Sequence, residues 1–208
     1  MSKVHPTLRV YDKQANYYDV MNSPMERFFS KGRKVFSLLR GNILELGVGT
    51  GLNLSYYHSS TNVTALDWSS QMVNQARAKV RRLRLHQVKK IVVGDIMELD
   101  KHFKPHTFDF VTSTCVFCSV PDPIKGLQEI AKILKPSGFL VQIEHGLSNF
   151  RFINFFMKFF DPFIVKWRGF HITRNTLKNL KIAGFETIHQ WSLDPTGIIR
   201  VIISKLDS

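Results

Sequence analysis

The segment from Asn42 to Leu54 constrains the fold of this chain more than any other, because three glycines occupy alternate positions in it. It reads N-I-L-E-L-G-V-G-T-G-L-N-L, an apolar run followed by Gly47, Gly49 and Gly51. Glycine lets a backbone turn sharply and approach a ligand without a Cβ in the way. A helix is expected from Gly51 through Tyr56, and the start of a helix presents unpaired N–H groups. The segment predicts a strand–turn–helix unit suited to binding a ligand.

The ligand predicted for this unit is not a dinucleotide. The fingerprint G-x-G-x-x-G fails because Leu52 stands at the third glycine position. Glu45 lies two residues before the first glycine, and a carboxylate there suits a cationic ligand better than a pyrophosphate. The pattern E-x-G-x-G-x-G resembles motif I of class I S-adenosylmethionine (SAM) dependent methyltransferases, whose cofactor carries a sulfonium and an ammonium. That resemblance implies SAM as cofactor, with Glu45, Gly47, Gly49, Gly51 and Asn53 among its binding residues. An ordinary strand–turn–helix unit remains the alternative for the segment taken by itself.

Further apolar runs follow in the order typical of that family. Val63 to Leu66 predicts a second strand, and Asp67 comes twenty residues after Gly47, where a nucleotide-binding unit places the acid that binds the ribose. The resemblance covers Tyr11 to Ile203 and implies an α/β, Rossmann-like fold. Its sheet has seven strands, mostly parallel with an antiparallel last strand, and helices on both faces. Strands are also expected at 88–93, 108–113, 186–192 and 198–204, and the stretch L-K-P-S-G-F-L-V-Q-I-E-H-G resembles the family's turn and fifth strand, which Glu144 and His145 end. The family pattern adds Trp68, Asp95, Ile96 and Thr114 to the cofactor site.

The N-terminal region is expected to be helical. The sequence Y-D-K-Q-A-N-Y-Y-D-V-M-N, which starts at Tyr11, resembles the segment before motif I in ubiquinone/menaquinone C-methyltransferases. In that family this helix closes over the cofactor, which makes Tyr11 and Tyr18 candidates to cover the site. The alternative is that the tyrosines only pack the helix onto the core. Pro24 is expected to start a second helix, Met25 to Leu39, so that residues 1–40 form a helical lid.

The stretch T-C-V-F-C-S-V-P-D-P follows the fourth strand and resembles bacterial phospholipid N-methyltransferases and the methyltransferase-like thiol methyltransferases. It contains both cysteines of the chain, Cys115 and Cys118. A C-x-x-C pair is compatible with redox or metal chemistry. Its apolar flanks and the lack of further cysteines favour buried, pocket-lining thiols and no metal, in a reducing setting.

Candidate catalytic residues are Tyr18, His145 and His171, with Glu144 beside them. Methyl transfer is an in-line displacement, so positioning and exclusion of water supply much of the catalysis. An amine or thiolate acceptor needs a modest base at most, whereas a quinol ring carbon needs a real one. A structural role is the alternative for each histidine. Thr173 is expected to cap the helix that follows His171.

Half of the residues from Phe150 to Phe163 are phenylalanine, and Arg151, Lys158, Lys166 and Arg168 lie among or after them. An aromatic helix face flanked by basic residues is typical of a helix that lies in a membrane interface. The alternative, which is compatible with the first, is a lid packed over an apolar acceptor pocket. Residues 146–172 are therefore expected to form an aromatic insertion over the acceptor site. The segment from Phe150 to Phe163 is too short and too charged to span a bilayer.

The formal net charge of +13 implies an anionic partner or surface. The helix that Ser69 is expected to cap runs to about Leu85 and is basic in its second half, as either a solvated face or a binding patch. Nucleic acid is not the expected partner, since no N-P-P-Y or D-P-P-Y tetrad occurs. The N-terminus lacks the apolar run of a signal peptide, which favours a cytoplasmic protein, peripheral on the inner face of the membrane. The oligomeric state is left open.

The sequence as a whole predicts one domain, residues 1–208, with methyltransferase activity on a lipid or other apolar small molecule. Phosphatidylethanolamine N-methylation is the leading specific expectation. Methylation of a quinone ring carbon and S-methylation of a small thiol are the alternatives. A nucleic-acid-binding or RNA-modifying protein is the hypothesis outside this class, and it depends on the charge alone.

Overall fold

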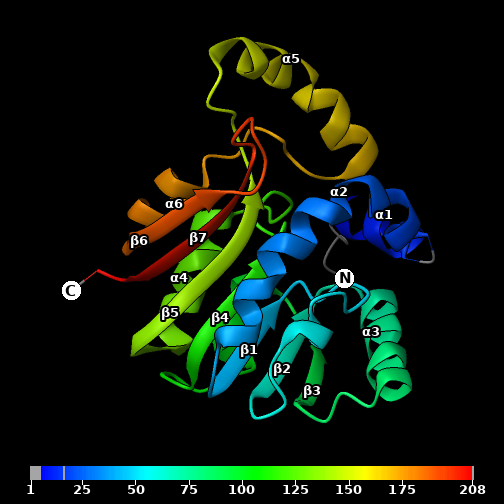
Figure 1. The fold of residues 1–208 in the computed structure, drawn as a ribbon, viewed down its shortest axis with the longest axis vertical. Coiled ribbons are helices and arrows are strands. Elements are labelled where there is room, and N and C mark those ends of the chain that lie inside the picture. The colour runs from blue at the N-terminus through cyan, green and yellow to red at the C-terminus, as the bar shows by residue number, and fades with distance from the viewer. Residues whose placement is uncertain (1–5, 16, 208) are drawn as a thin grey trace.

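The computed structural model describes residues 6–15 and 17–207, and it places a seven-stranded sheet at the centre (Figure 1). The strand order is β3-β2-β1-β4-β5-β7-β6. The first five strands pair in parallel, whereas β7 runs antiparallel to both of its neighbours, β5 and β6. The expected mixed sheet with an antiparallel last strand is confirmed.

In chain order the elements are α1 (Pro6–Gln14), α2 (Tyr18–Arg33), the 3₁₀ turn η1 (Lys34–Leu38), β1 (Asn42–Leu46), η2 (Leu54–Tyr56), β2 (Asn62–Asp67), α3 (Ser70–Leu83), β3 (Val88–Val93), η3 (Ile96–Lys101), β4 (Phe108–Thr114), α4 (Pro123–Ile133), β5 (Leu134–His145), α5 (Arg151–Arg168), α6 (Thr176–Ile182), β6 (Phe185–Ser192) and β7 (Ile199–Leu206).

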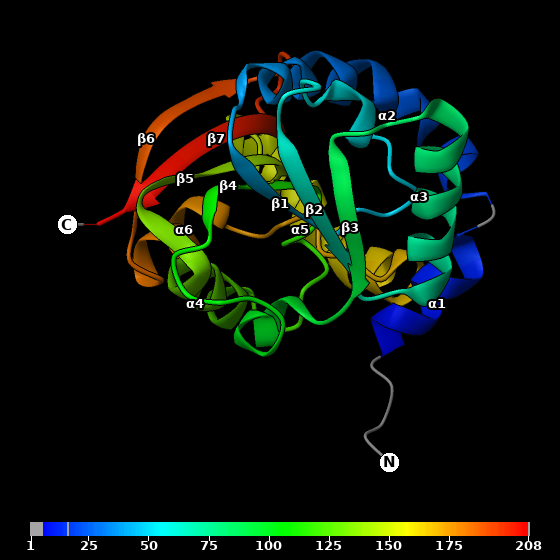
Figure 2. The same cartoon turned by 90° about the horizontal axis from the view of Figure 1, so that it is seen from below.

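Helices cover both faces of the sheet, as Figure 2 shows from below. Side chains alternate between the two faces along β1, because successive residues of a strand point to opposite sides. Leu44 belongs to the core layer that includes Ile130 of α4, whereas Ile43 belongs to the layer that includes Phe36 of η1 and Val73 of α3. The central strands are therefore buried on both sides, as their apolar runs predict.

Two expected helix starts are wrong. α2 runs continuously from Tyr18 to Arg33, so the chain does not start a new helix at Pro24, whose side chain lies outside the described residues. A proline inside a helix removes one backbone hydrogen bond, which packing of the rest of the helix can outweigh. The helix expected from Gly51 through Tyr56 cannot start at Gly51, whose φ of +84° lies outside the right-handed helical region, and only the 3₁₀ turn η2 forms in this stretch.

The expected caps have mixed outcomes. Ser69 caps α3 as predicted, since its side chain accepts a hydrogen bond from the Met72 amide at 3.2 Å. The predicted cap Thr173 is wrong, because α6 begins later and Asn175 caps it by accepting from the Lys178 amide. The expected lid, residues 1–40, is described from Pro6 onward without residue 16. Among the described helices, none is long and apolar enough to cross a membrane.

Candidate active site

Two hollows meet where the loop after β1 faces α1 and α2. The smaller hollow, about 90 Å³, is lined by Asp67, Trp68 and Ile96. The larger, about 380 Å³, reaches under α5. Because the two hollows share a boundary, an elongated ligand can extend from one into the other with its middle at that boundary. Both hollows are lined by Tyr11, Tyr18, Gly47, Gly49, Thr114 and Cys115, all but one of which are predicted cofactor-binding residues.

The glycine-rich loop forms a cradle at this boundary. Gly47 and Gly49 have φ values of +61° and +54°, a region that side chains disfavour. A Cβ on Gly47 would lie 2.5 Å from Val116 Cγ2, whereas a Cβ on Gly49 would project into open space, where Gly47 O is its nearest neighbour at 4.0 Å. Gly51 lines neither hollow and shapes the turn instead. The open space beside Gly49 is where a bound ligand can approach the backbone.

The variant Gly49→Ala is expected to weaken SAM binding about tenfold, because the new methyl group occupies the cradle. The left-handed φ at this position costs the folded protein about 1–2 kcal/mol, with or without SAM. Gly184→Ala is the matched control: Gly184 has a φ of +82° with nothing within 4 Å of the added Cβ. Both variants should lose similar thermal stability, and calorimetric titration should show weaker SAM binding only for Gly49→Ala. Equal affinities in the two variants would contradict a cradle at Gly49.

Asp67 holds the loop from the end of β2. Its Oδ2 accepts the Gly49 amide and its Oδ1 accepts the Ser69 amide, each at 2.8 Å. Burial raises the pKa of Asp67 to about 6, although these amide donors oppose the shift. Ser69 also donates its hydroxyl to Asp12, which ties α1 to this edge of the sheet. The carboxylate thus lies between the cradle and the smaller hollow, a position suited to the predicted ribose contact.

The predicted adenine residues divide into two groups. Trp68 and Ile96 line the smaller hollow. Asp95 does not, and its carboxylate caps η3 by accepting the Met97 amide at 2.8 Å. The structure therefore brings Trp68 and Ile96 to the site and holds Asp95 beside it, where its contact with an adenine amino group stays a prediction.

Asn53 links three elements at the wall of the larger hollow. Its Nδ2 donates to Glu45 Oε1 at 2.8 Å and to Thr114 Oγ1 at 3.1 Å. Its Oδ1 accepts from Nε of Arg33. Glu45 is fully buried and lines neither hollow, so its predicted action on a cofactor, relayed by Asn53, stays a prediction. Burial raises the pKa of Glu45 to about 7, against the lowering effect of Tyr57, Asn53 and Arg33.

Arg33 is a site residue that the sequence analysis missed. It lines the larger hollow, is only 4% exposed and forms an ion pair with Glu26. A buried guanidinium needs partners of opposite charge. The sequence does contain one feature that could have indicated its burial. Arg33 lies four residues after Phe29 and three before Phe36, on a helical stripe that is otherwise apolar.

The residues in and behind the walls of the two hollows fit SAM by their chemistry. Asp67 offers acceptors for ribose hydroxyls, and the Arg33 guanidinium matches a carboxylate. Asn53 in the wall of the larger hollow is hydrogen-bonded to the buried Glu45 carboxylate, whose negative charge suits a cofactor that carries an ammonium. SAM supplies, when bound, an electrophilic methyl group on a sulfonium. Among the residues that the structure describes, no group of three or more potential metal ligands occurs.

Tyr11 and Tyr18 lie together at the boundary, with ring centroids 6.1 Å apart. Burial raises the pKa of both phenols well above their ordinary value. The hydroxyls therefore stay protonated, and each can orient a ligand but is a poor proton acceptor. α2 is fastened over the loop by Asp19, whose carboxylate accepts the Thr50 hydroxyl at 2.6 Å.

The two candidate histidines occupy different environments. His145 lines the larger hollow, and burial lowers its pKa to about 4, so it is neutral near pH 7. The His171 Nδ1 lies 2.8 Å from Asp161 Oδ2, and its side chain is not part of the wall of either hollow. The structure brings His145 and Tyr18 to the larger hollow and leaves His171 at the base of α5, where its catalytic role stays a prediction.

The two cysteines line the larger hollow, and Glu144, which does not line it, holds their loop from behind. Glu144 Oε1 accepts the Val116 and Phe117 amides at 3.0 and 3.1 Å, which fixes the loop that carries the cysteines. Cys115 and Cys118 are free and line the larger hollow. Burial raises the pKa of both thiols.

Comparisons with known proteins agree with this geometry. Residues 44–142 match the family model described as a methyltransferase domain. The chain is 38% identical over 105 residues to a phosphatidylethanolamine N-methyltransferase of Cereibacter sphaeroides, with 50% of this chain and 51% of that protein covered. It is 31% identical over 172 residues to a human thiol S-methyltransferase, with 76% and 69% covered. A demethylmenaquinone methyltransferase of Listeria welshimeri is 31% identical over 157 residues, with 71% and 64% covered.

The match spans about half the length of the Cereibacter sphaeroides relative, 51%. Among solved structures, a Haemonchus contortus phosphoethanolamine-type N-methyltransferase in complex with S-adenosylhomocysteine has a TM-score of 0.73 at 17% identity, covering 100% of this chain and 62% of that one. At that identity the likeness shows the fold alone. The human relative is covered over more than two thirds of its length at 31% identity, which shows the family. This chain belongs to the SAM-dependent methyltransferases.

Proposed function

We propose that the chain transfers the methyl group of SAM to a lipid or other apolar small molecule, with the amine of phosphatidylethanolamine as the leading acceptor. The observation that carries this proposal is the composition of the larger hollow. Its walls include Met25 and Phe29 of α2, Met157 of α5, and Phe170 and Ile172 of the loop after α5. An apolar wall beside a cofactor groove favours an acceptor with a hydrocarbon part. The similarity to the Cereibacter sphaeroides enzyme supports the amine as the acceptor group.

The acid–base groups of the larger hollow favour an acceptor that brings its own lone pair. The phenols of Tyr11 and Tyr18 and the thiols of Cys115 and Cys118 are held protonated by their raised pKa values. His145, with a pKa of about 4, is a weak base. A neutral amine can form its bond to the methyl carbon while the bond from that carbon to sulfur breaks, and its ammonium proton leaves to water beforehand. A quinol carbon needs a stronger base, so these residues support the amine over the ring carbon.

The test is an acceptor panel with labelled SAM: phosphatidylethanolamine dispersed in detergent, a short-chain demethylmenaquinol and a small thiol. We expect label in phosphatidylethanolamine, released as its N-methyl derivative. Transfer confined to the small thiol would replace this proposal with S-methylation, which the similarity to the human thiol methyltransferase supports. Transfer confined to the quinol would replace this proposal with methylation of a quinone ring carbon, which the similarity to the Listeria welshimeri enzyme supports.

The variant His145→Gln separates these chemistries further. With the amine acceptor we expect turnover to fall by less than about tenfold, because removal of an essential general base costs roughly 10²–10⁴-fold. Tyr18→Phe serves as the control that alters the same boundary without removing a base. A loss of about a thousandfold in His145→Gln alone would assign the proton to His145 and contradict an acceptor that needs no strong base.

The arrangement of the helices supports the remaining expectations. Residues 1–40 are proposed as a lid, since Asp12 and Asp19 tie α1 and α2 to Ser69 and Thr50 beside the cofactor groove. Residues 146–172 are proposed as the roof of the acceptor pocket. An anionic membrane is proposed as the partner, which would place the protein peripherally on the inner face of the membrane.

A further inference from the structure

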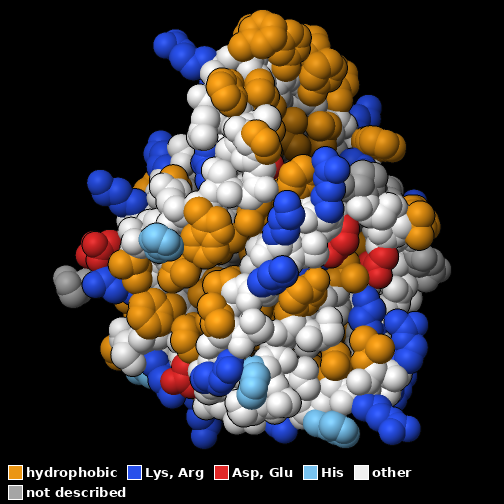
Figure 3. Space-filling model, viewed as in Figure 1, with side chains coloured by type: hydrophobic (Ala, Val, Ile, Leu, Met, Phe, Trp, Pro, Cys, Tyr) orange, Lys and Arg blue, Asp and Glu red, His pale blue; other side chains and the backbone are white. Residues whose placement is uncertain are grey.

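α5 carries a ridge of large aromatic side chains, here called the phenylalanine ridge: Phe152, Phe155, Phe159, Phe163 and Trp167. Each of these side chains is between 62% and 74% exposed, and none of the residues of α5 is buried. Figure 3 shows the hydrophobic surface gathered over this end of the molecule. Contiguous apolar surface of this kind marks an interaction site.

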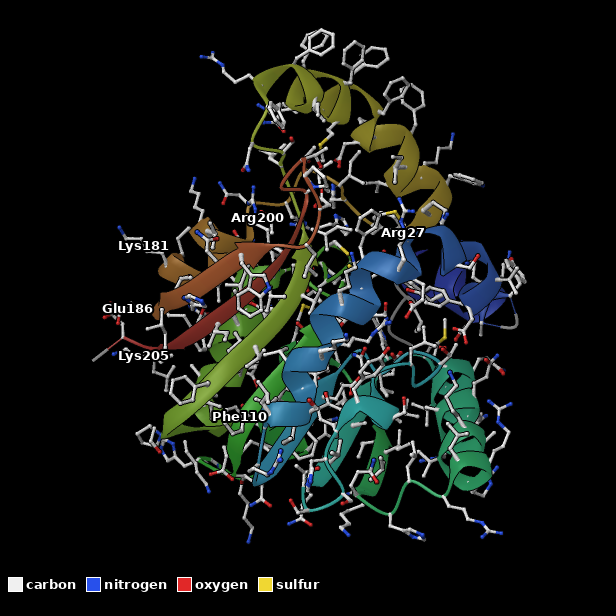
Figure 4. All side chains as sticks on the ribbon, in the orientation of Figure 1. Arg27, Phe110, Lys181, Glu186, Arg200 and Lys205 are labelled. Carbon is white, nitrogen blue, oxygen red and sulfur yellow. The ribbon has the colours of Figure 1, made fainter. Side chains whose placement is uncertain are left out.

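The ridge points away from the body because the opposite face of α5 is the one that is anchored. Met157 lines the larger hollow. Four residues later, one helical turn on, Asp161 accepts the amides of Ile172 and Thr173 at 2.7 and 3.2 Å and pairs with His171. In Figure 4 aromatic rings project outward along α5, on the side away from the sheet.

The rings of α5 contact one another. Phe152 and Phe156 have centroids 4.9 Å apart, and Phe159 lies 5.1 Å from Phe160. In each pair a ring of the ridge packs against a neighbouring phenylalanine beside it, and all four side chains stay exposed. The ridge is therefore a preformed apolar face, fixed from beneath by Asp161 and Met157.

The charge around the ridge identifies the kind of surface that covers it. α5 contains the basic residues Arg151, Lys158, Lys166 and Arg168 and a single acid, Asp161, which is held by the loop at residues 171–173. The chain has a net charge of +13. A second copy would bring like charges together, and nucleic acid offers no apolar phase for the rings. An anionic lipid interface supplies both the apolar phase and the opposite charge.

We propose that the phenylalanine ridge inserts into the interface of an anionic membrane and that the acceptor passes from the bilayer into the larger hollow beneath α5. The residues that line the larger hollow indicate the route of the acceptor. Apolar side chains lie on its side toward α5 and on α2: Met157, Phe170, Ile172, Met25 and Phe29. The acceptor route rests on the proposed function, whereas insertion of the ridge does not.

The test uses the full chain and flotation with vesicles of phosphatidylcholine, with or without phosphatidylglycerol. We expect binding to the anionic vesicles that weakens as salt rises. The triple variant F155S/F159S/F163S should lower the vesicle partition coefficient at least about tenfold. The control L38S/L83S also removes exposed apolar side chains, 75% and 47% exposed, from elements away from α5 and should bind as the wild type does. Unchanged SAM affinity in both variants verifies that they fold.

Several results would overturn the proposal. These are no binding to anionic vesicles, equal loss of binding in the two variants, or a dimer in solution that F155S/F159S/F163S dissociates. For the acceptor route, the triple variant should lose methylation of phosphatidylethanolamine in anionic vesicles and keep it in detergent micelles. Vesicle binding without methylation in either medium would uphold insertion of the ridge and reject the proposed acceptor.

Discussion

Asp67→Asn is expected to weaken SAM binding about a hundredfold. Both oxygens of Asp67 accept backbone amides, from Gly49 and Ser69, at 2.8 Å. An asparagine can accept only one of them, and its NH₂ group then faces the other donor. A hydrogen bond to a charged group contributes about 1.5–3 kcal/mol, and the variant disturbs the cradle as well as the predicted ribose contact. Calorimetric titration with SAM and S-adenosylhomocysteine measures the loss.

Asp109→Asn is the matched control for this variant. Asp109 also accepts a backbone amide, from Asn42 at 2.8 Å, and it pairs with Lys135 at 2.6 Å, but it lines neither hollow. The pKa of Asp109 is lowered by these contacts against burial, so its replacement should alter stability and leave SAM affinity unchanged. If Asp109→Asn weakened SAM binding as much as Asp67→Asn, the loss would report a general loosening of the sheet.

The cofactor half of the site could be predicted from the sequence because local patterns determine it. Gly47 and Gly49 adopt positive φ next to a buried strand, and Asp67 ends the neighbouring strand, so the order of strands in a parallel sheet brings them together. Asp67 bonds directly to the Gly49 amide, as this order requires. Spacing along the chain is sufficient information for contacts of this kind.

The acceptor half could not be predicted in the same way, because its walls come from segments that are distant in sequence. Phe29, Met157 and Ile198 line one hollow although they belong to α2, α5 and the loop before β7. Their proximity depends on how helices pack on the sheet, which apolar periodicity does not specify. Arg33 was missed for this reason, since a basic residue on a helix is usually solvated, and only the packed structure shows it buried against Asn53.

The helix boundaries show where local rules give way to tertiary structure. A proline predicted a helix start at Pro24, yet α2 continues from Tyr18 to Arg33. The bonds from Asp19 to Thr50 and from Arg33 to Asn53 fasten both ends of α2 to the site. These contacts, made with residues far along the chain, favour one continuous helix across the proline.

Glu45→Gln is expected to stabilise the ligand-free protein while weakening SAM binding. The pKa of Glu45 is about 7 in the folded protein and near 4.5 when unfolded, because burial penalises its charge. A pKa raised by folding contributes stability that is complete below pH 4.5 and is lost as the pH rises through 7. At pH 8 the uncharged glutamine avoids that loss, so we expect the free energy of unfolding to rise by about 2–3 kcal/mol, with little change at pH 5. Urea unfolding at the two pH values measures both.

Asp67 and Glu144 also have pKa values raised by burial, so they too make the stability of the protein depend on pH. Their contribution is the same in wild type and in Glu45→Gln, so the difference between the two proteins reports Glu45 alone. Glu129→Gln is the control, since Glu129 is also buried, at 5% exposure, but pairs with Lys132, and its loss should destabilise α4. A glutamine at position 45 keeps the bond to Asn53 but removes the negative charge that suits a cationic cofactor, so SAM affinity should fall about tenfold. A destabilised variant, or one that binds SAM as the wild type does, would mean that the Glu45 charge serves the fold. A variant that is more stable but binds SAM more weakly would mean that the buried Glu45 charge is retained for cofactor binding, at a cost in stability.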